Sequence, residues 1–124
     1  MIFPKIGFHF DDFGHGPGNA VITQSGSDIC PVAVRVDRTQ AHAGVQFANG
    51  QFMSTVEIGP QNQGPVKFTN CGFWGTGLTK EQVRKRPIIL EQGLRAATVL
   101  GCTFRGAEAI EDQSGADVKI GLNT

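Results

Sequence analysis

Hydrophobic and polar residues repeat in a short pattern along the second half of the chain. In each copy the first and third positions are apolar and the second is usually polar, and a phenylalanine follows a small or amide residue at the end. Complete copies occupy 45–52, 66–73 and 97–104, and 118–120 begins the pattern again. Successive starts lie 21, 31 and 21 residues apart. A period of about 20 residues built on short strands is typical of a solenoid of stacked coils.

Shorter alternations predict the remaining strands. Ile6, Phe8 and Phe10 occupy alternate positions, as in a half-buried strand. Further strand candidates are 20–22, 32–36, a segment in which Val56 and Ile58 face inward around Glu57, and 88–90. Glycine and proline predict a turn at 14–19 and a loop at 59–65, which would close a coil.

The pattern predicts a single β-helix domain over residues 1–124, in which 1–19 form an irregular first coil. One coil is about ten residues longer than its neighbours, and the excess at 75–86 predicts an inserted loop on one face. Thr79 and Gln82 have the spacing of a weak capping box, so a single helical turn is expected there. Residues 117–124 are expected to form the first strand of a further coil.

Equivalent positions in the copies predict which side chains stack. Phe52, Phe73 and Phe104 align, and so form an aromatic ladder inside the solenoid. Asn49 and Asn70 align as corner residues, which tolerate left-handed backbone and can hydrogen-bond from coil to coil. Cys71 and Cys102 also align, and we expect a buried pair of thiols at the strand spacing of about 4.8 Å, with a disulfide as the alternative.

The copies of the form Val-x-Phe-x-Asn-Cys-x-Phe resemble coils of the right-handed parallel β-helix of the pectate-lyase superfamily, closely over 44–124 and loosely over 1–43. The resemblance implies an all-β, right-handed parallel β-helix (solenoid) of about four to five coils with one short inserted loop. It also implies an origin among polysaccharide-acting or surface proteins. Enzymes of this superfamily are usually two or more times longer, so the chain resembles a run of coils from one of them.

Composition narrows the function classes. Eleven basic residues balance eleven acidic ones, so neither nucleic acid nor an anionic membrane is predicted as a partner. No apolar run is long enough to span a bilayer, and residues 1–5 lack the order of a signal peptide. The location is expected to be extracellular or periplasmic if the resemblance extends that far, and cytoplasmic otherwise. Three cysteines without a Cys-x-x-Cys motif argue against a zinc knuckle, and no cofactor is predicted.

The densest polar cluster lies near the start of the chain. Asp11-Asp12 and Gly14-His15-Gly16 resemble the Asp-Asp and Gly-His-Gly motifs of polygalacturonases, which makes Asp11, Asp12 and His15 candidate catalytic residues. In those enzymes the motifs lie about one coil apart, whereas only Phe13 separates them here. Adjacent carboxylates on a strand point to opposite faces, and inverting hydrolysis needs them about 6.5–9.5 Å apart around a water. A solvated turn accounts for the same residues.

Metal binding is the other interpretation of that cluster, with His9, Asp11 and His15 as candidate ligands. The superfamily's lyases bind calcium through carboxylates on the outer face of parallel strands. The matching outward positions are Gln46, Lys67, Thr98 and Lys119, and none of them is a carboxylate. On another strand, Arg35 and Glu57 are expected to form a surface ion pair worth less than about 1 kcal/mol.

Trp74 is a candidate for ligand contact. It follows an inward-facing phenylalanine and should therefore face outward, as a sugar-stacking platform or an interface anchor, with partial burial under the insertion as the alternative. The adjacent basic residues Lys80, Arg84, Lys85 and Arg86 could contact an acidic sugar or a neighbouring subunit, and a solvated loop is the alternative.

The sequence therefore predicts a non-catalytic binding or assembly module with carbohydrate as candidate ligand. A short solenoid exposes strand edges and apolar interior at its ends, so self-association into a homo-oligomer is expected. The alternative is a polysaccharide-active enzyme, a pectin-type hydrolase or lyase, or a fragment of one.

Overall fold

The computed structural model describes residues 5–11, 19–27, 30–41, 43–74, 88–104, 110–115 and 117–124. Fourteen strands and no helix are found in these ranges. The strands are β1 (Ile6–Asp11), β2 (Ala20–Thr23), β3 (Gly26–Ser27), β4 (Val32–Thr39), β5 (Val45–Ala48), β6 (Gln51–Phe52), β7 (Thr55–Asn62), β8 (Val66–Thr69), β9 (Gly72–Phe73), β10 (Ile88–Leu90), β11 (Ala96–Leu100), β12 (Thr103–Phe104), β13 (Ile110–Asp112) and β14 (Asp117–Gly121).

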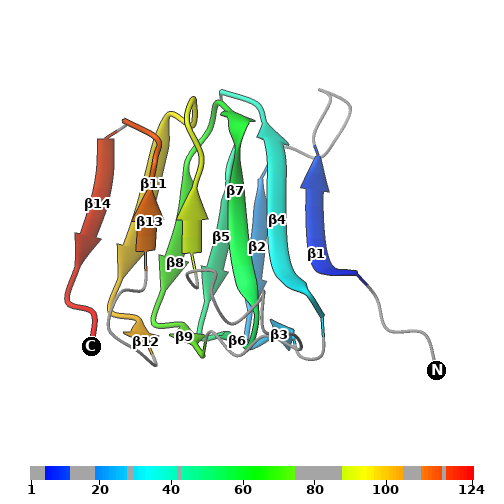
Figure 1. The fold of residues 1–124 in the computed structure, drawn as a ribbon, viewed down its shortest axis with the longest axis vertical. Helices are drawn as coiled ribbons and strands as arrows, with labels where there is room; N and C mark the ends of the chain where they lie inside the picture. The colour runs from blue at the N-terminus through cyan, green and yellow to red at the C-terminus, as the bar shows by residue number, and fades with distance from the viewer. Residues whose placement is uncertain are drawn as a thin grey trace.

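The strands form three parallel sheets that the chain visits in turn. The first has the order β1-β4-β7-β10-β13, the second β14-β11-β8-β5-β2 and the third β12-β9-β6-β3. Neighbours in each sheet are about one coil apart in the sequence, so the chain climbs from one end of the stack to the other, with β1 and β14 at opposite ends (Figure 1). The predicted all-β parallel solenoid is confirmed, and its right-handed sense stays a prediction.

The core consists of rows of equivalent side chains. In the second sheet the inward row contains Ile22, Phe47, Phe68, Val99 and Ile120 in direct register. The predicted ladder is confirmed: the ring centroids of Phe52 and Phe73 are 5.5 Å apart, and those of Phe73 and Phe104 are 5.0 Å apart. Full burial of a phenylalanine contributes about 1.5–3 kcal/mol, so these rows are a principal source of stability.

Corners between the second and third sheets use left-handed backbone in every coil. The corner residues are Gln24, Asn49, Asn70, Gly101 and Leu122, with φ between 51° and 61°. The side-chain amide of Asn70 donates to Asn49 Oδ1 at 2.8 Å, as the alignment predicted. The two asparagines thus adopt the left-handed backbone of the corner and also link adjacent coils by a hydrogen bond.

One predicted loop is wrong. Residues 59–62, expected within a loop over 59–65, belong to β7, which continues to Asn62. Pairing with β4 overrides the Gly-Pro signal, because Gln61 and Asn62 remain in register with Arg38 and Thr39 beyond a β-bulge. The buried Asn62 amide adds hydrogen bonds to the carbonyls of Val36 and Gly59, at 2.8 and 2.7 Å.

Other predictions were met or lie outside the described ranges. The strand candidates at 6–10, 20–22, 32–36 and 88–90 are confirmed as parts of β1, β2, β4 and β10. β14 is the expected start of a further coil, and Thr124 then pairs with Cys102 and Phe104 beyond the corner. The turn predicted at 14–19 lies outside the described residues except for Asn19, and so does the insertion predicted at 75–86 with the helical turn expected in it. Within those that are described, no helix has the length and apolar character to span a membrane.

Candidate functional site

A polar recess of about 340 Å³ lies on the outer side of the third sheet. It extends over β6, β9 and β12 and over the corners that precede them. Its lining residues are Asn49, Gln51, Asn70, Cys71, Gly72, Trp74 and Thr103. An aromatic ring among amide and hydroxyl groups is a combination that suits ligands with both apolar faces and hydroxyls.

Trp74 is half-buried at one side of this recess, and its position is fixed by Gln51. The indole Nε1–H donates to Gln51 Oε1 at 2.8 Å. Gln51 stands one coil away, in register with Gly72, and its side chain reaches along the stack across that glycine. A Cβ built on Gly72 would lie 2.4 Å from Gln51 Oε1, so the missing side chain provides the space in which the amide lies.

Several lining groups keep hydrogen-bonding capacity for a ligand. Asn70 donates to Asn49, which leaves the Asn49 NH₂ group and Asn70 Oδ1 without a partner among the described residues. The NH₂ group of Gln51 likewise has no hydrogen-bond partner among the described residues. Among the described residues, the Thr103 hydroxyl has only a long contact with Thr124, 3.5 Å between their hydroxyl oxygens. The recess therefore presents donors and acceptors side by side.

Cys71 forms part of the wall and stacks on Cys102, as predicted. The backbone N–H of Cys71 donates to Cys102 Sγ at 3.4 Å, and both thiols are buried and free. The hydrogen bond between the two thiols lowers the pKa of Cys71 to about 7 and raises the pKa of Cys102. The two thiols therefore titrate as a coupled pair, in two steps that belong to the pair rather than to either residue.

The prediction for Trp74 is refined by its half-burial. The side chain is neither fully exposed nor fully buried, and part of it remains accessible beside the recess. The basic residues predicted to act with it, Lys80, Arg84, Lys85 and Arg86, lie outside the described residues, so their role stays a prediction.

The outer face of the first sheet carries a connected charged network. Arg35 Nη1 lies 2.5 Å from Glu57 Oε2 and 3.5 Å from Glu91 Oε1, and Arg35 Nε lies 2.6 Å from Asp37 Oδ1. His9 Nε2 contacts Asp37 Oδ2 at 2.5 Å. The ion pair predicted between Arg35 and Glu57 is confirmed, and it proves to be the centre of a larger cluster.

Hydrogen bonding keeps this network ionised. Burial alone would raise the pKa of the Asp37 carboxyl, but hydrogen bonds from His9 and Arg35 outweigh it and hold the pKa below its usual value. Burial alone would likewise lower the pKa of Arg35, and its bonds to Asp37 and Glu57 raise it instead. Because both groups are held charged, the network links coils rather than supplying a free acid or base.

The predicted catalytic and metal cluster is only partly within the described residues. His9 is engaged with Asp37, and Asp11 pairs with Arg38 Nε at 3.4 Å. Asp12 and His15 lie outside the described residues. In the part of the chain that is described, no three histidine, cysteine or acidic side chains gather in a group able to hold a metal ion. The catalytic role of Asp11, Asp12 and His15 stays a prediction.

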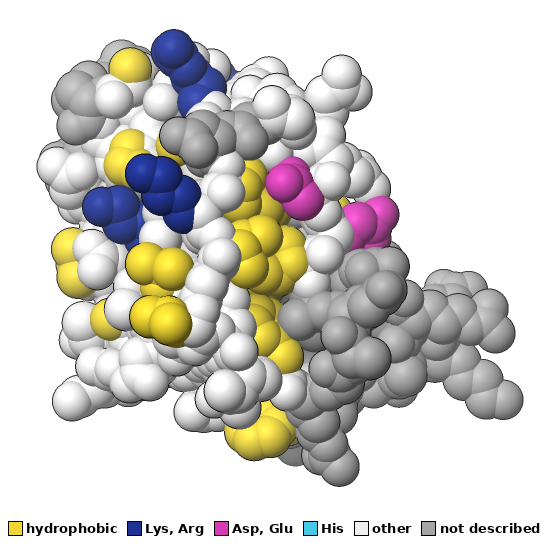
Figure 2. Space-filling view, turned by 90° about the vertical axis from the view of Figure 1, so that its left-hand side faces the viewer, with side chains coloured by type: hydrophobic (Ala, Val, Ile, Leu, Met, Phe, Trp, Pro, Cys, Tyr) yellow, Lys and Arg dark blue, Asp and Glu magenta, His cyan; other side chains and the backbone are white. Residues whose placement is uncertain are grey.

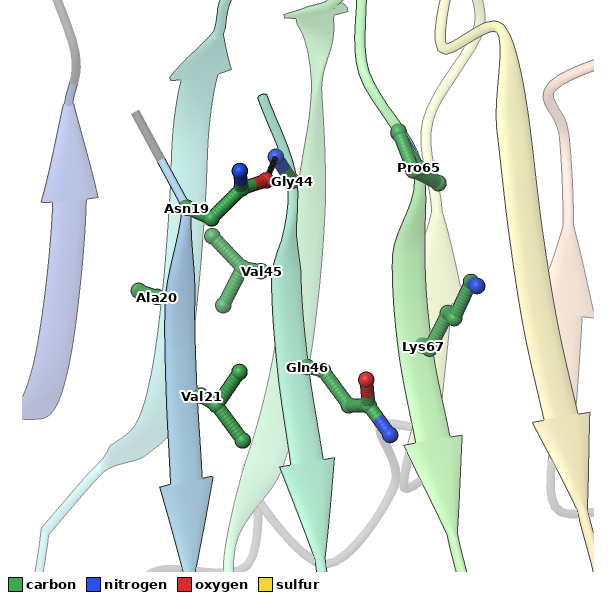
Figure 3. Close-up of a pocket in the computed structure, with 8 residues that line it drawn as sticks. All are labelled: Asn19, Ala20, Val21, Gly44, Val45, Gln46, Pro65 and Lys67. Atoms are coloured by element: carbon green, nitrogen blue, oxygen red, sulfur yellow. Dashed lines mark hydrogen bonds between the residues drawn. The ribbon is translucent and has the colours of Figure 1, made fainter. Parts of the chain in front are cut away.

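A second, smaller hollow of about 260 Å³ lies across β2, β5 and β8 (Figure 3). Asn19 Oδ1 accepts from the Gly44 backbone N–H at 3.0 Å at its edge, and Gln46 and Lys67 project from neighbouring strands. These two residues belong to the predicted outward column, whose register is confirmed. Its described lining residues include no aromatic ring, so they offer less to a sugar than those of the Trp74 recess.

The end of the solenoid at β14 exposes apolar interior. Figure 2 shows a strip of hydrophobic side chains there, with basic groups on one side and acidic groups on the other. Ile120, an inward-row residue, is 49% exposed, and Leu122 at the corner is 89% exposed. No strand among the described residues covers this end.

Sequence reasoning missed several members of these sites. Gln51, Gly72 and Thr103 occupy the position before the ladder phenylalanine in each copy, so their alignment was a usable signal that they share one face. Asp37 and Glu91 were not predicted, because a bulge in β4 and the end of β10 bring them to Arg35, and neither feature has a mark in the repeat.

Comparison with known proteins returned nothing on which to base an assignment: no family model matches the chain, and neither the curated proteins nor the solved structures include a match.

Proposed function

We propose that this chain is a non-catalytic binding module of the pectate-lyase-like β-helix class, which recognises carbohydrate at the Trp74 recess and associates with further copies through its open end. The observation that carries the proposal is the indole of Trp74, held by Gln51 at the edge of a recess lined by amides and a hydroxyl. Sugars offer an apolar ring face for stacking and a rim of hydroxyls for such groups.

The class assignment is supported by the repeat and by the parallel stack. Aligned asparagines, cysteines and phenylalanines form rows, as the resemblance implies. On the first sheet, Arg35 engages Asp37, Glu57 and Glu91, so these carboxylates take part in links within and between coils.

Binding is tested by calorimetric titration with soluble oligosaccharides, comparing wild type with three variants. Trp74→Ala should weaken binding by about 30-fold or more, the loss typical of an aromatic hot spot of about 2 kcal/mol. Gly72→Ala should weaken it by about 2- to 10-fold, because the new methyl group displaces the Gln51 amide from Nε1.

Gln46→Ala is the matched control, since it removes an amide from the other hollow and should leave affinity unchanged. Circular dichroism establishes that each variant remains folded. Wild-type affinity in Trp74→Ala would overturn the proposal, and a loss in Gln46→Ala alone would move the site to the second sheet.

Self-association is supported by the exposed end of the core. Apolar strips of this kind with unpaired strand edges favour contact with another chain. A contact between unlike ends is heterologous and would extend into a stack rather than close into a ring.

A further inference from the structure

The described part of the recess lining carries no fixed charge. Asn49, Gln51, Asn70 and Thr103 are neutral polar residues, and among the described lining residues the only ionisable group is the thiol of Cys71, which is 2% exposed. A carboxylate ligand placed here would lose hydration without gaining an ionic partner from these residues. A ligand whose polar groups are hydroxyls would exchange water for amide and hydroxyl partners at no such cost.

The order of the lining groups indicates the direction in which a bound ligand would extend. Gln51, Gly72 and Thr103 are successive members of one row, and Asn49 and Asn70 are neighbours in a second row beside it. Both rows run along the solenoid axis, perpendicular to the strands. The first spans two strand spacings, about 9.6 Å, which is longer than a single sugar ring.

The position of Trp74 places the stacking surface within this row. Its N–H is already used by Gln51, so the part of the ring that remains exposed offers a stacking surface rather than a hydrogen-bond donor. Thr103, one coil beyond Gly72, offers its hydroxyl farther along the axis. One ring stacked on Trp74 would therefore leave the far end of the row for a second unit of the same chain.

From this arrangement we infer that the ligand is an uncharged oligosaccharide of at least two units, which lies along the solenoid axis across β6, β9 and β12. The inference rests on the proposed function and specifies its ligand. It departs from the acidic, pectin-like sugar that the sequence resemblance implies, because the described lining contains no cation.

The test uses the fluorescence of Trp74, which is the only tryptophan in a chain without tyrosine. The full chain is titrated with a neutral gluco-oligosaccharide series and with oligogalacturonates of equal lengths, at about 0.01 M and about 1 M salt, between which the Debye length falls from about 30 Å to about 3 Å. The neutral trisaccharide should bind about tenfold more tightly than the monosaccharide, with affinity unchanged by salt.

Thr103→Val provides an internal control for direction, because it removes only the hydroxyl at the far end of the row. It should weaken the trisaccharide by several-fold and leave the monosaccharide unaffected. Equal binding of monosaccharide and trisaccharide, or no effect of Thr103→Val on either, would overturn the axial placement.

The two proposals fail differently. Tighter binding of the galacturonates, lost at high salt, would overturn the uncharged ligand and leave carbohydrate recognition standing. Failure of both series to change the fluorescence, or to give heat in the calorimeter, would overturn the proposed function and the inference with it.

Discussion

At the scale of single residues, the corners show how local backbone chemistry supports the stack. Asn49 and Asn70 have φ values of 58° and 51°, a region that disfavours side chains with a Cβ unless the side chain makes a local hydrogen bond. Their mutual bond at 2.8 Å supplies that compensation. Gly101 fills the same position without a side chain, which indicates that the coil requires the conformation more than the amide.

Two substitutions at Asn70 separate these contributions. Asn70→Ala should destabilise the fold by about 1.5–3 kcal/mol, because it loses a hydrogen bond and retains left-handed strain. Asn70→Gly loses the hydrogen bond alone and should cost about half as much. Urea denaturation of both variants measures the difference, and an equal loss in the two would show that backbone strain contributes nothing here.

At the scale of elements, strands of two to eight residues are stable only because they stack. β6, β9 and β12 have two residues each, yet each places one phenylalanine in the ladder and one residue in the outer row. The same strands therefore build the core on one side and the candidate recess on the other. A substitution in the phenylalanine ladder should therefore shift the residues that line the recess, because both belong to the same short strands.

Phe73 and Phe104 provide a matched pair for testing the ladder. Phe73 is fully buried between two stacked rings, and Phe104 is only partly buried at the end of the row. Phe73→Ala should lower the free energy of unfolding by about 3–5 kcal/mol, and Phe104→Ala by clearly less. Similar losses in denaturant titrations would contradict a ladder whose contribution depends on contacts from both sides.

At the scale of the whole molecule, the solenoid is asymmetric both around its axis and along it. The first sheet carries the ion-paired network of Arg35 on its outer face, while Lys67 and Lys119 project from the second. Along the axis, a paired interior gives way to an open apolar end at β14. The proposed ligand site and the proposed contact between copies therefore lie on different parts of the molecule.

Association through the β14 end predicts a specific sensitivity. Ile120→Lys should raise the dissociation constant by about tenfold or more, because it places a charge in the apolar strip. Thr69→Lys, which adds the same charge to an exposed mid-stack position, should have no effect. Analytical ultracentrifugation across a dilution series measures both.

Leu122→Asn is a second variant, which tests the same contact if the lysine of Ile120→Lys unfolds β14. It removes the most exposed apolar side chain and suits a residue with φ of 55°, so it should weaken association while preserving stability. A wild-type mass of 13.2 kDa at every concentration would contradict association altogether.

Much of the fold could be predicted because the repeat consists of apolar side chains at equivalent positions. Phe52, Phe73 and Phe104 align in sequence, and burial forces aligned residues into a row. The extent of β7 could not be predicted in this way: Gly59 and Pro60 signal a loop, and only pairing with β4 keeps the chain extended. Of the candidate site, Trp74 was predicted, whereas the contact with Gln51 depends on the space above Gly72.

The sequence by itself determined the period, the parallel stack and the rows of the core, because each depends on which residues recur at equivalent positions. The tertiary structure alone decided which outward side chains meet. Gln51 reaches Trp74 across Gly72, and Arg35 gathers Asp37, Glu57 and Glu91, because polar side chains lean over neighbouring coils in directions that a linear pattern does not specify. Burial is a property that recurs with the repeat, whereas a contact between side chains depends on the free space around each one.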